Sequence, residues 1–204
     1  MKIILDGMGG DNAPFSVVEG AVLASRQTQH HICIIGQEEL IIPELKKYKY
    51  ESEKISVINA TQVISNDDAP VRAVRSKKDS SIVKGINMVK NGEGDIFISA
   101  GSTGALLAGG LFILGRIQGI DRPALASVYP IVGGIPSLLV DAGANADCKP
   151  NNLLEFGIMG NIYMEKVIGR KDPKVGLVNI GAEAAKGSTL TKAAYDLLEQ
   201  SHLN

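Results

Sequence analysis

Small and polar residues gather where two short apolar runs end. Residues 2–5 (KIIL) lead into 6–12 (DGMGGDN), and residues 96–99 (IFIS) lead into 100–104 (AGSTG). Glycine lets the backbone approach a ligand closely. A helix that begins in the second turn would point unpaired amides and its positive end at an anion, so phosphate is the natural candidate. The predicted ligand contacts are Asp6, Gly9, Asp11, Gly101, Ser102, Thr103 and Gly104.

Two later apolar runs end in similar turns. Leu138–Val140 leads into residues 141–145 (DAGAN), and Val175–Ile180 leads into 181–183 (GAE). In an open parallel sheet the carboxyl ends of the strands share one edge, where ligands bind. Each turn alone is equally explained as a capped strand-to-helix connection, and there is no Walker or dinucleotide-binding spacing. The four turns together favour a ligand cleft.

Three residues near the later turns are candidates for catalysis. Lys149 and Lys186 could pair with phosphate or polarise a carbonyl oxygen, although each could also be a solvated surface lysine. Asn145 could orient a reacting group. Cys148 could be a thiolate nucleophile activated by its neighbour Lys149, but no partner histidine is evident in the sequence. We predict Lys186, Asn145 and Lys149 as the catalytic set.

A cluster of cations follows residues 67–70 (DDAP). On a short helix it would form a positive patch on a weakly acidic protein, suited to an acidic partner, and a solvated helix face is the alternative. The predicted partner-binding residues are Arg72, Arg75, Lys77 and Lys78.

The elements that must position these residues alternate along the chain. Short runs apolar on both faces indicate buried parallel strands, and amphipathic stretches between them indicate helices. Pro14 suits a first helical position, and Asp79 could cap a helix that Asn91 and Gly92 end. Gly133 with Gly134 suggest a hairpin or a loop at the sheet edge. We therefore predict an α/β fold of three layers with a mostly parallel sheet, forming one domain over 1–204. The expected strands are Lys2–Leu5, Ile32–Ile35, Ile55–Ile58, Ile96–Ser99, Ala124–Val128, Leu138–Val140 and Val175–Ile180.

Composition excludes several classes of protein. The 204 residues carry a net charge of -1, only 4% aromatics and no Trp, which argues against nucleic-acid binding. Two cysteines cannot form a disulfide-rich scaffold, and His30-His31 lacks companion ligands, so no metal is predicted. The apolar run Ala105–Leu114 is too short to cross a bilayer, and Asp6 interrupts any signal peptide, so we expect a cytoplasmic protein. The chain stops after a helix where the alternation calls for a strand, which predicts a C-terminally truncated fragment.

Four motifs resemble those of the PlsX family of bacterial phosphate acyltransferases. The resemblance runs through the whole chain and also includes 179–181 (NIG) with 186–187 (KG). The four motifs are residues 6–14 (DGMGGDNAP), 70–81 (PVRAVRSKKDSS), 99–106 (SAGSTGAL) and 141–150 (DAGANADCKP).

The resemblance implies transfer of a fatty acyl group from acyl carrier protein to inorganic phosphate, which yields acyl-phosphate for phospholipid synthesis. It also implies a fold similar to isocitrate dehydrogenases and phosphotransacetylases, a homodimer, loose contact with the cytoplasmic membrane, and no cofactor or metal. The acyl chain needs an apolar groove, for which Leu106–Leu114 is one candidate, although that stretch also suits a buried core helix.

The sequence departs from the family pattern at several positions. Ser102 stands where the family often has Asn, and Ala182, Ala184 and Ala185 stand where its members are usually more acidic or bulkier. The family also continues past residue 204. A phosphotransacetylase-like enzyme using acyl-coenzyme A and a non-catalytic fragment therefore remain alternatives.

Overall fold

The computed structural model describes residues 1–183 and 185–204. The chain divides into two units, Met1–Gly115 and Arg116–Asn204, and each is described here by itself. The prediction of one domain over 1–204 stays a prediction.

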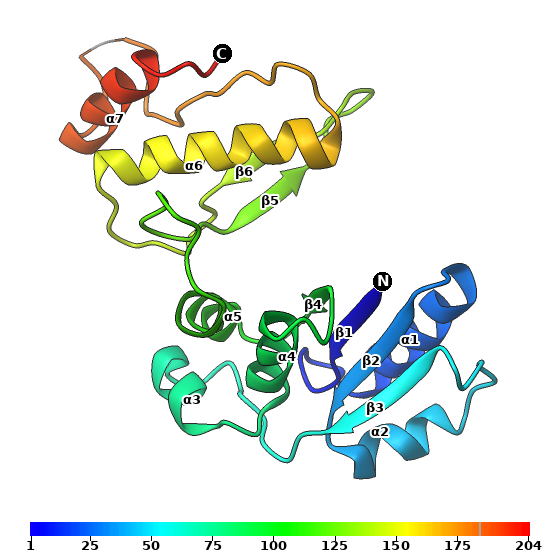
Figure 1. The fold of residues 1–204 in the computed structure, drawn as a ribbon. Coiled ribbons are helices and arrows are strands. Elements are labelled where there is room, and N and C mark those ends of the chain that lie inside the picture. The colour runs from blue at the N-terminus through cyan, green and yellow to red at the C-terminus, as the bar shows by residue number, and fades with distance from the viewer. Residues whose placement is uncertain (184) are drawn as a thin grey trace. The chain divides into compact units, whose positions relative to one another are not determined.

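A four-stranded parallel sheet forms the centre of unit 1 (Figure 1). Its order is β3-β2-β1-β4, and β1 pairs with both β2 and β4 in parallel. The first four predicted strands are confirmed: β1 is Lys2–Asp6, β2 is His31–Gly36, β3 is Ile55–Asn59 and β4 is Ile96–Ile98.

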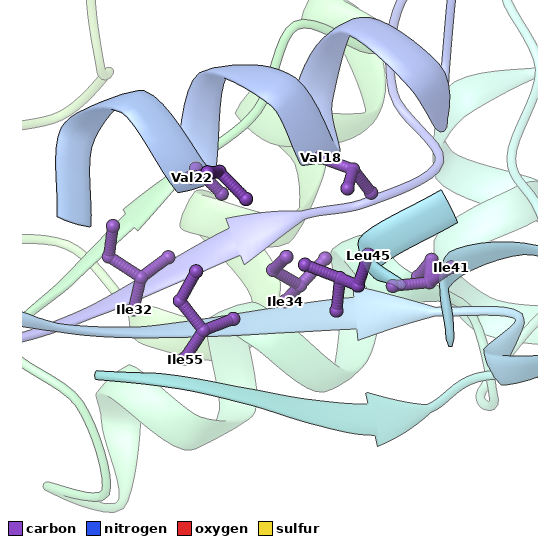
Figure 2. Packing of buried hydrophobic residues seen from close by; sticks show 8 residues of the cluster. Val18, Val22, Ile32, Ile34, Ile41, Leu45 and Ile55 are labelled. Carbon is purple, nitrogen blue, oxygen red and sulfur yellow. The ribbon is translucent and has the colours of Figure 1, made fainter. Parts of the chain in front are cut away.

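Helices cover both faces of this sheet. The side chains of β2 alternate between two apolar clusters, with Ile32 and Ile34 in one and Cys33 and Ile35 in the other. Helices α1 and α2 supply the first cluster, in which Val18, Val22, Ile41 and Leu45 surround Ile32, Ile34 and Ile55 (Figure 2). Helix α4 supplies Met88 to the second. This is the predicted three-layer α/β arrangement, and the bounds are α1 Phe15–Gln27, α2 Glu38–Leu45 and α4 Ser81–Lys90.

A further apolar cluster joins α4 to the helix before it, α3, and to the helix after it, α5. Its buried members include Val74 of α3, Ile82 and Ile86 of α4, and Ala105 of α5. The remaining helical segments of unit 1 are α3 Pro70–Ser76, α5 Thr103–Gly109 and the π-helical turn η1 Gly110–Leu114, which continues α5 directly.

Two predicted helix starts are displaced by one residue. Pro14 lies at the N-cap position of α1 rather than inside its first turn. Ser80, not Asp79, caps α4, because the Ser80 hydroxyl accepts the Val83 amide while the Asp79 carboxylate binds Thr61 and Lys84. The predicted end of α4 at Asn91 and Gly92 is confirmed, since Asn91 is its C-cap and Gly92 has a φ of +74°.

Unit 2 begins with the predicted hairpin. Strands β5 and β6 pair antiparallel, and Gly133 in their turn has a φ of +71°. Buried side chains of α6, η2 and α7, namely Phe156, Met164 and Ala194, form the apolar interior of the described part. The bounds are β5 Ala126–Tyr129, β6 Ser137–Val140, α6 Pro150–Tyr163, η2 Met164–Ile168 and α7 Thr189–Glu199.

The seventh predicted strand, Val175–Ile180, is wrong. This segment has no regular secondary structure, and Val178 and Ile180 are 79% and 83% exposed. A strand needs a neighbour to satisfy its backbone, and the described residues provide no ladder partner for this segment. No helix in the described part of the chain is long and apolar enough to span a membrane.

Candidate functional site

The carboxyl ends of β1 and β4 meet where the strand order of the sheet reverses. From β1 the chain proceeds outward to β2 and β3, and then returns to place β4 on the other side of β1. This reversal is the position where open α/β sheets bind ligands. The turns after the two strands are in contact, because a Cβ built on Gly9 would lie 2.7 Å from the Gly101 nitrogen.

The Asp6 carboxylate holds these two turns together. Asp6 is 1% exposed. Its Oδ1 accepts the Met8 amide at 3.0 Å and its Oδ2 accepts the Ser99 hydroxyl at 2.6 Å. The Ser99 oxygen in turn accepts the Gly101 amide at 3.0 Å. Asp6 is thus buried and hydrogen-bonded inside the protein, and the open part of its turn is formed by neighbours such as the exposed Asp11.

The second turn leaves donors free at the start of α5. The Ser102 hydroxyl accepts the Ala105 amide at 3.3 Å, and its carbonyl accepts the Leu106 amide. Within residues 1–183 and 185–204, the amides of Thr103 and Gly104 have no hydrogen-bond acceptor. Thr103 is exposed. The amides of Thr103 and Gly104 and the hydroxyls of Ser102 and Thr103 can together bind an oxyanion. The Gly101 amide is not available, because it donates to the Ser99 oxygen.

Ser99 is the side chain of this network that is missing from the predicted ligand contacts. It lies directly after β4, at the end of an apolar run, where the sequence predicts the last residue of a strand. The sequence signal that could have identified Ser99 as a site residue is a hydroxyl at the carboxyl end of a strand beside the sheet centre. An apolar groove of about 290 Å³ adjoins the same point and is lined by residues of β1, β4 and α1, including Asp6, Ser99, Ile98 and Gly20.

The predicted convergence of four turns at one parallel edge is corrected by the strand directions. Only the turns after β1 and β4 follow strands of the parallel sheet. The turn at 141–145 follows β6, which is antiparallel to β5, and the turn at 181–183 follows the irregular segment Val175–Ile180. The last two turns belong to unit 2.

The turn at 141–145 is organised by its first residue. Asp141 has a φ of +38°, and its carboxylate accepts the amides of Ala144 and Asn145, both at 3.1 Å. The side-chain amide of Asn145 donates to the Pro123 carbonyl at 2.9 Å. One proton of the Asn145 side-chain amide therefore stabilises this loop, and its second amide proton and its side-chain oxygen remain to contact another group.

The two candidate lysines of unit 2 are both exposed. Lys149 immediately precedes α6, and its backbone amide donates to Asn152. Lys186 lies in the loop before α7, where its amide donates to the Glu183 carbonyl at 2.9 Å. Of the three alanines that depart from the family pattern, Ala182 and Ala185 are exposed and Ala184 lies outside the described residues.

Cys148 is unsuited to act as a thiolate nucleophile. Burial raises the pKa of its thiol, and the negative charge of Asp141 raises it further. The thiol is therefore protonated at neutral pH. Among the described residues there is also no cluster of three or more His, Cys, Asp or Glu side chains that could hold a metal ion.

The cationic cluster on and after α3 divides into two kinds of residue. Lys77 is committed to the protein, because its ammonium binds the Asp68 carboxylate at 2.6 Å and the Val63 carbonyl at 2.8 Å. The hydrogen bond from the Lys77 ammonium lowers the pKa of the Asp68 carboxyl. Lys78 reaches the Val74 carbonyl at 3.3 Å. Arg72, Arg75 and Lys78 are exposed, and the two arginines are the exposed members beside the ones that bind the protein itself.

Arg75 extends this exposed surface toward the end of η1. Its guanidinium carbon lies 5.4 Å from the centroid of the Phe112 ring, which is itself half exposed. Residues 69–72 with Arg75 and Ser76 line an adjacent open groove. We call Arg72, Arg75 and Phe112 the α3 patch.

The sheet order defines a class of protein, the open α/β proteins whose parallel sheet has a strand-order switch point. Two solved structures share the fold: a phosphotransacetylase from Streptococcus pyogenes, with a TM-score of 0.68 and 22% identity, and the EutD phosphotransacetylase from Staphylococcus aureus, with 0.67 and 21%. The first match covers 100% of this chain and 67% of that protein, and the second covers 98% and 64%.

Sequence comparison narrows the class to a family. The chain belongs to the fatty acid synthesis protein family, whose model matches residues 1–203. Proteins named phosphate acyltransferase from Alkaliphilus oremlandii and Clostridioides difficile are 58% and 52% identical to it over 204 residues. These matches cover 100% of this chain but only 61% and 60% of those proteins. The chain therefore spans about three-fifths of the length of these curated relatives.

Proposed function

We propose that this chain carries the phosphate-binding part of an acyltransferase that moves a fatty acyl group from acyl carrier protein to inorganic phosphate. Membership of the fatty acid synthesis protein family and the name phosphate acyltransferase among relatives above 50% identity support this activity. The observation that carries the proposal is the turn after β4, where the amides of Thr103 and Gly104 have no acceptor in the described part of the chain.

The turn would serve the reaction by holding phosphate in position. A phosphate oxygen attacks the thioester carbonyl carbon, the C–O bond forms, and the C–S bond then breaks. The carrier-protein thiolate leaves and takes up the proton that phosphate gives up. Phosphate needs no covalent intermediate on the protein, so orientation and stabilisation of the oxyanion are the main tasks. The groove between α1 and β4 would give the acyl chain an apolar surface beside the turn.

Lys186, Lys149 and Asn145 stay our proposed catalytic residues. The two ammonium groups are exposed and can approach an oxyanion, and the Asn145 side-chain oxygen can accept a hydrogen bond. We expect Lys186→Ala to lower acyl-phosphate formation by about a hundredfold or more, the loss typical of one charge-stabilising donor. Circular dichroism should show an unchanged fold, because Lys186 is exposed. Wild-type turnover in Lys186→Ala would remove this residue from the mechanism.

The activity is tested by mixing the chain with acylated carrier protein and following thiol release with and without phosphate. Phosphate-dependent release supports the proposal. Phosphate binding in calorimetry without thiol release would assign the chain to the non-catalytic alternative. Absence of both binding and release would overturn the proposal.

A second candidate substrate is acyl-coenzyme A. The observation that favours it is the shared fold with two phosphotransacetylases. The same thiol assay with acyl-coenzyme A and acyl carrier protein at equal concentrations separates the two, and we expect faster release from the carrier protein.

The α3 patch is our proposed contact for the carrier protein, with Arg72 and Arg75 supplying the charge and with smaller parts for Lys77 and Lys78, which are tied to the protein. We expect Arg72→Glu with Arg75→Glu to weaken carrier-protein binding by about tenfold or more at low salt, because opposite charges across an interface are replaced by like charges. Binding is measured by calorimetry at two salt concentrations.

The control for this experiment changes the same net charge elsewhere. Lys46 and Lys49 are exposed residues after α2, outside the α3 patch. Lys46→Glu with Lys49→Glu should leave carrier-protein affinity close to wild type. Equal weakening by both double variants would show a general charge effect and contradict a specific patch.

We also propose a homodimer and a peripheral contact with the cytoplasmic membrane, as the resemblance to the acyltransferase family implies. Light scattering tests the first and co-sedimentation with anionic lipid vesicles tests the second.

A further inference from the structure

We propose that Ser99 is a positioning residue that sets the direction of the amides in the turn at 101–104. This inference rests on the proposed phosphate site and concerns how that site is shaped. Ser99 lies between β4 and the turn, and its hydroxyl joins residues that are 93 positions apart in the chain.

The hydrogen bonds of Ser99 have a fixed polarity. Its hydroxyl has one proton, which it donates to the buried Asp6 carboxylate, a group that can only accept when ionised. The two oxygens of this hydrogen bond lie 2.6 Å apart. The lone pairs of the Ser99 oxygen are then left to accept the Gly101 amide at 3.0 Å. Because a peptide unit is planar and trans, this bond also fixes where the preceding carbonyl points, namely away from the Asp6 side.

Asp6 is itself held in place. Its other oxygen accepts the Met8 amide at 3.0 Å, and the residue is 1% exposed. Close packing limits the alternatives further, because a Cβ on Gly101 would lie 3.2 Å from the Gly9 Cα. The Asp6 carboxylate, the Ser99 hydroxyl and the Gly101 peptide are therefore linked in sequence, and the hydrogen bonds and close packing hold each of them in one orientation.

Ser99 acts on the anion site through this chain and does not contact the anion. The amides of Thr103 and Gly104, which are without acceptors in the described residues, begin two residues after the Gly101 peptide that Ser99 orients. Removing the hydroxyl leaves the Gly101 amide unpaired and takes one donor from Asp6. The Gly101 peptide can then rotate, and the direction of the following amides is no longer fixed.

The test compares Ser99→Ala, Ser99→Thr and Ser25→Ala in the 204-residue chain. Ser25 is a matched control, since it is a buried serine at no proposed site whose hydroxyl donates one hydrogen bond, to the Val22 carbonyl. Inorganic phosphate affinity is measured by calorimetry and folding by thermal melting. We expect Ser99→Ala to weaken phosphate binding about tenfold, the equivalent of one hydrogen bond in a charged network. Ser99→Thr should restore most of the affinity, and Ser25→Ala should not change it.

A second readout reports the mechanism directly. Nuclear magnetic resonance follows hydrogen exchange of the Gly101 amide, which should accelerate in Ser99→Ala and stay slow in Ser99→Thr. If Ser99→Ala does not fold, Ser99→Cys keeps the volume, weakens the hydrogen bonds and is expected to lower phosphate affinity in the same direction.

The outcomes separate this inference from the proposed function. Phosphate binding by the wild type with equal affinity in Ser99→Ala, or in Ser99→Cys if that variant replaces it, overturns the role of Ser99 and leaves the phosphate site standing. Weakened binding that Ser99→Thr does not rescue indicates a structural role only and also overturns the inference. No phosphate binding by the wild type overturns the proposed function and, with it, this inference.

Discussion

At the scale of single residues, the two turns at the switch point face each other through two glycines, Gly9 and Gly101. The close approach of the turns requires that these positions carry no side chain. A Cβ on Gly9 would lie 2.5 Å from the Asp6 Oδ2 and 2.7 Å from the Gly101 nitrogen. The second of these is a backbone atom and cannot rotate away as the end of a flexible side chain can. The turn after β1 and the turn after β4 can therefore approach only while residue 9 is glycine.

We expect Gly9→Ala to destabilise the protein by about 1–3 kcal/mol, the usual cost of inserting a methyl group into a packed site. Phosphate affinity should fall as well, because relief of the contact must displace either Asp6 or the Gly101 peptide. Denaturant unfolding and calorimetry with phosphate measure the two effects.

Gly20→Ala is the matched control for Gly9→Ala. A Cβ on Gly20 meets nothing within 4 Å, and the residue lies inside α1. The same chemical change should therefore stabilise the protein by roughly 0.5–1 kcal/mol. If both alanines had the same sign of effect, the steric account of Gly9 would be wrong.

At the scale of elements, the Asp79 carboxylate joins the loop after β3 to α4. Asp79 accepts the Thr61 amide at 2.8 Å and the Thr61 hydroxyl at 2.6 Å, and it pairs with the Lys84 ammonium. The hydrogen bond from Lys84 contributes most to lowering the pKa of Asp79 well below its ordinary value of 3.8, and the two bonds from Thr61 add to it. Asp79 was predicted to cap the helix, and it instead connects the helix to the sheet.

This lowered pKa gives a stability dependence with a definite sign. The unfolded chain binds a proton at Asp79 near pH 3.8, whereas the folded chain resists it until the pH is lower. The contribution of Asp79 is therefore complete above the unfolded pKa and is lost as the pH falls through the folded value. We expect Asp79→Asn to be less stable than wild type at pH 7 and to lose less further stability on acidification to pH about 2.

Denaturant unfolding at pH 7, 5, 4, 3 and about 2 measures this dependence. The exposed Asp67 provides the control, because Asp67→Asn makes the same chemical change three residues before α3 without touching the connection between Thr61 and α4. Parallel stability curves for wild type and Asp79→Asn would contradict the expectation.

The sequence predicts a helix, strand or turn well where its formation depends on its own residues. The prediction fails where formation depends on partners that are distant in the chain. β2 is apolar on both faces, and this pattern alone places it in the interior of the sheet. Val175–Ile180 is also rich in branched apolar residues, yet a strand also needs a neighbouring backbone, which composition cannot supply. The turns at 6–12 and 99–104 could be paired in advance by their glycines, whereas the bond between Asp6 and Ser99 depends on β1 and β4 being adjacent, and the spacing of 93 residues does not reveal this.

At the scale of the whole molecule, the buried apolar residues are divided unevenly between the two units. All three apolar clusters lie in Met1–Gly115, where isoleucines of β1 and β2 such as Ile4 and Ile34 are fully buried. In the described part of Arg116–Asn204, large apolar side chains such as Val132, Val178 and Ile180 are mostly exposed. Burial of apolar area is the main favourable term in folding, so unit 1 should hold most of the stability of this chain.

This division predicts that residues 1–115 fold without the rest of the chain, whereas residues 116–204 do not. A length of about 115 residues with a sheet covered on both faces is sufficient for a cooperative core. We expect the 1–115 fragment to unfold in a single transition and to give dispersed amide resonances, with the slowest hydrogen exchange in β1 and β2. The 116–204 fragment serves as the comparison and should show narrow dispersion and no cooperative transition.

Ile34→Ala should lower the stability of the 1–115 fragment by about 2–5 kcal/mol, as expected for truncation of a fully buried side chain. A 1–115 fragment that fails to fold, or an Ile34→Ala change that costs nothing, would show that the stability of unit 1 depends on residues beyond Gly115.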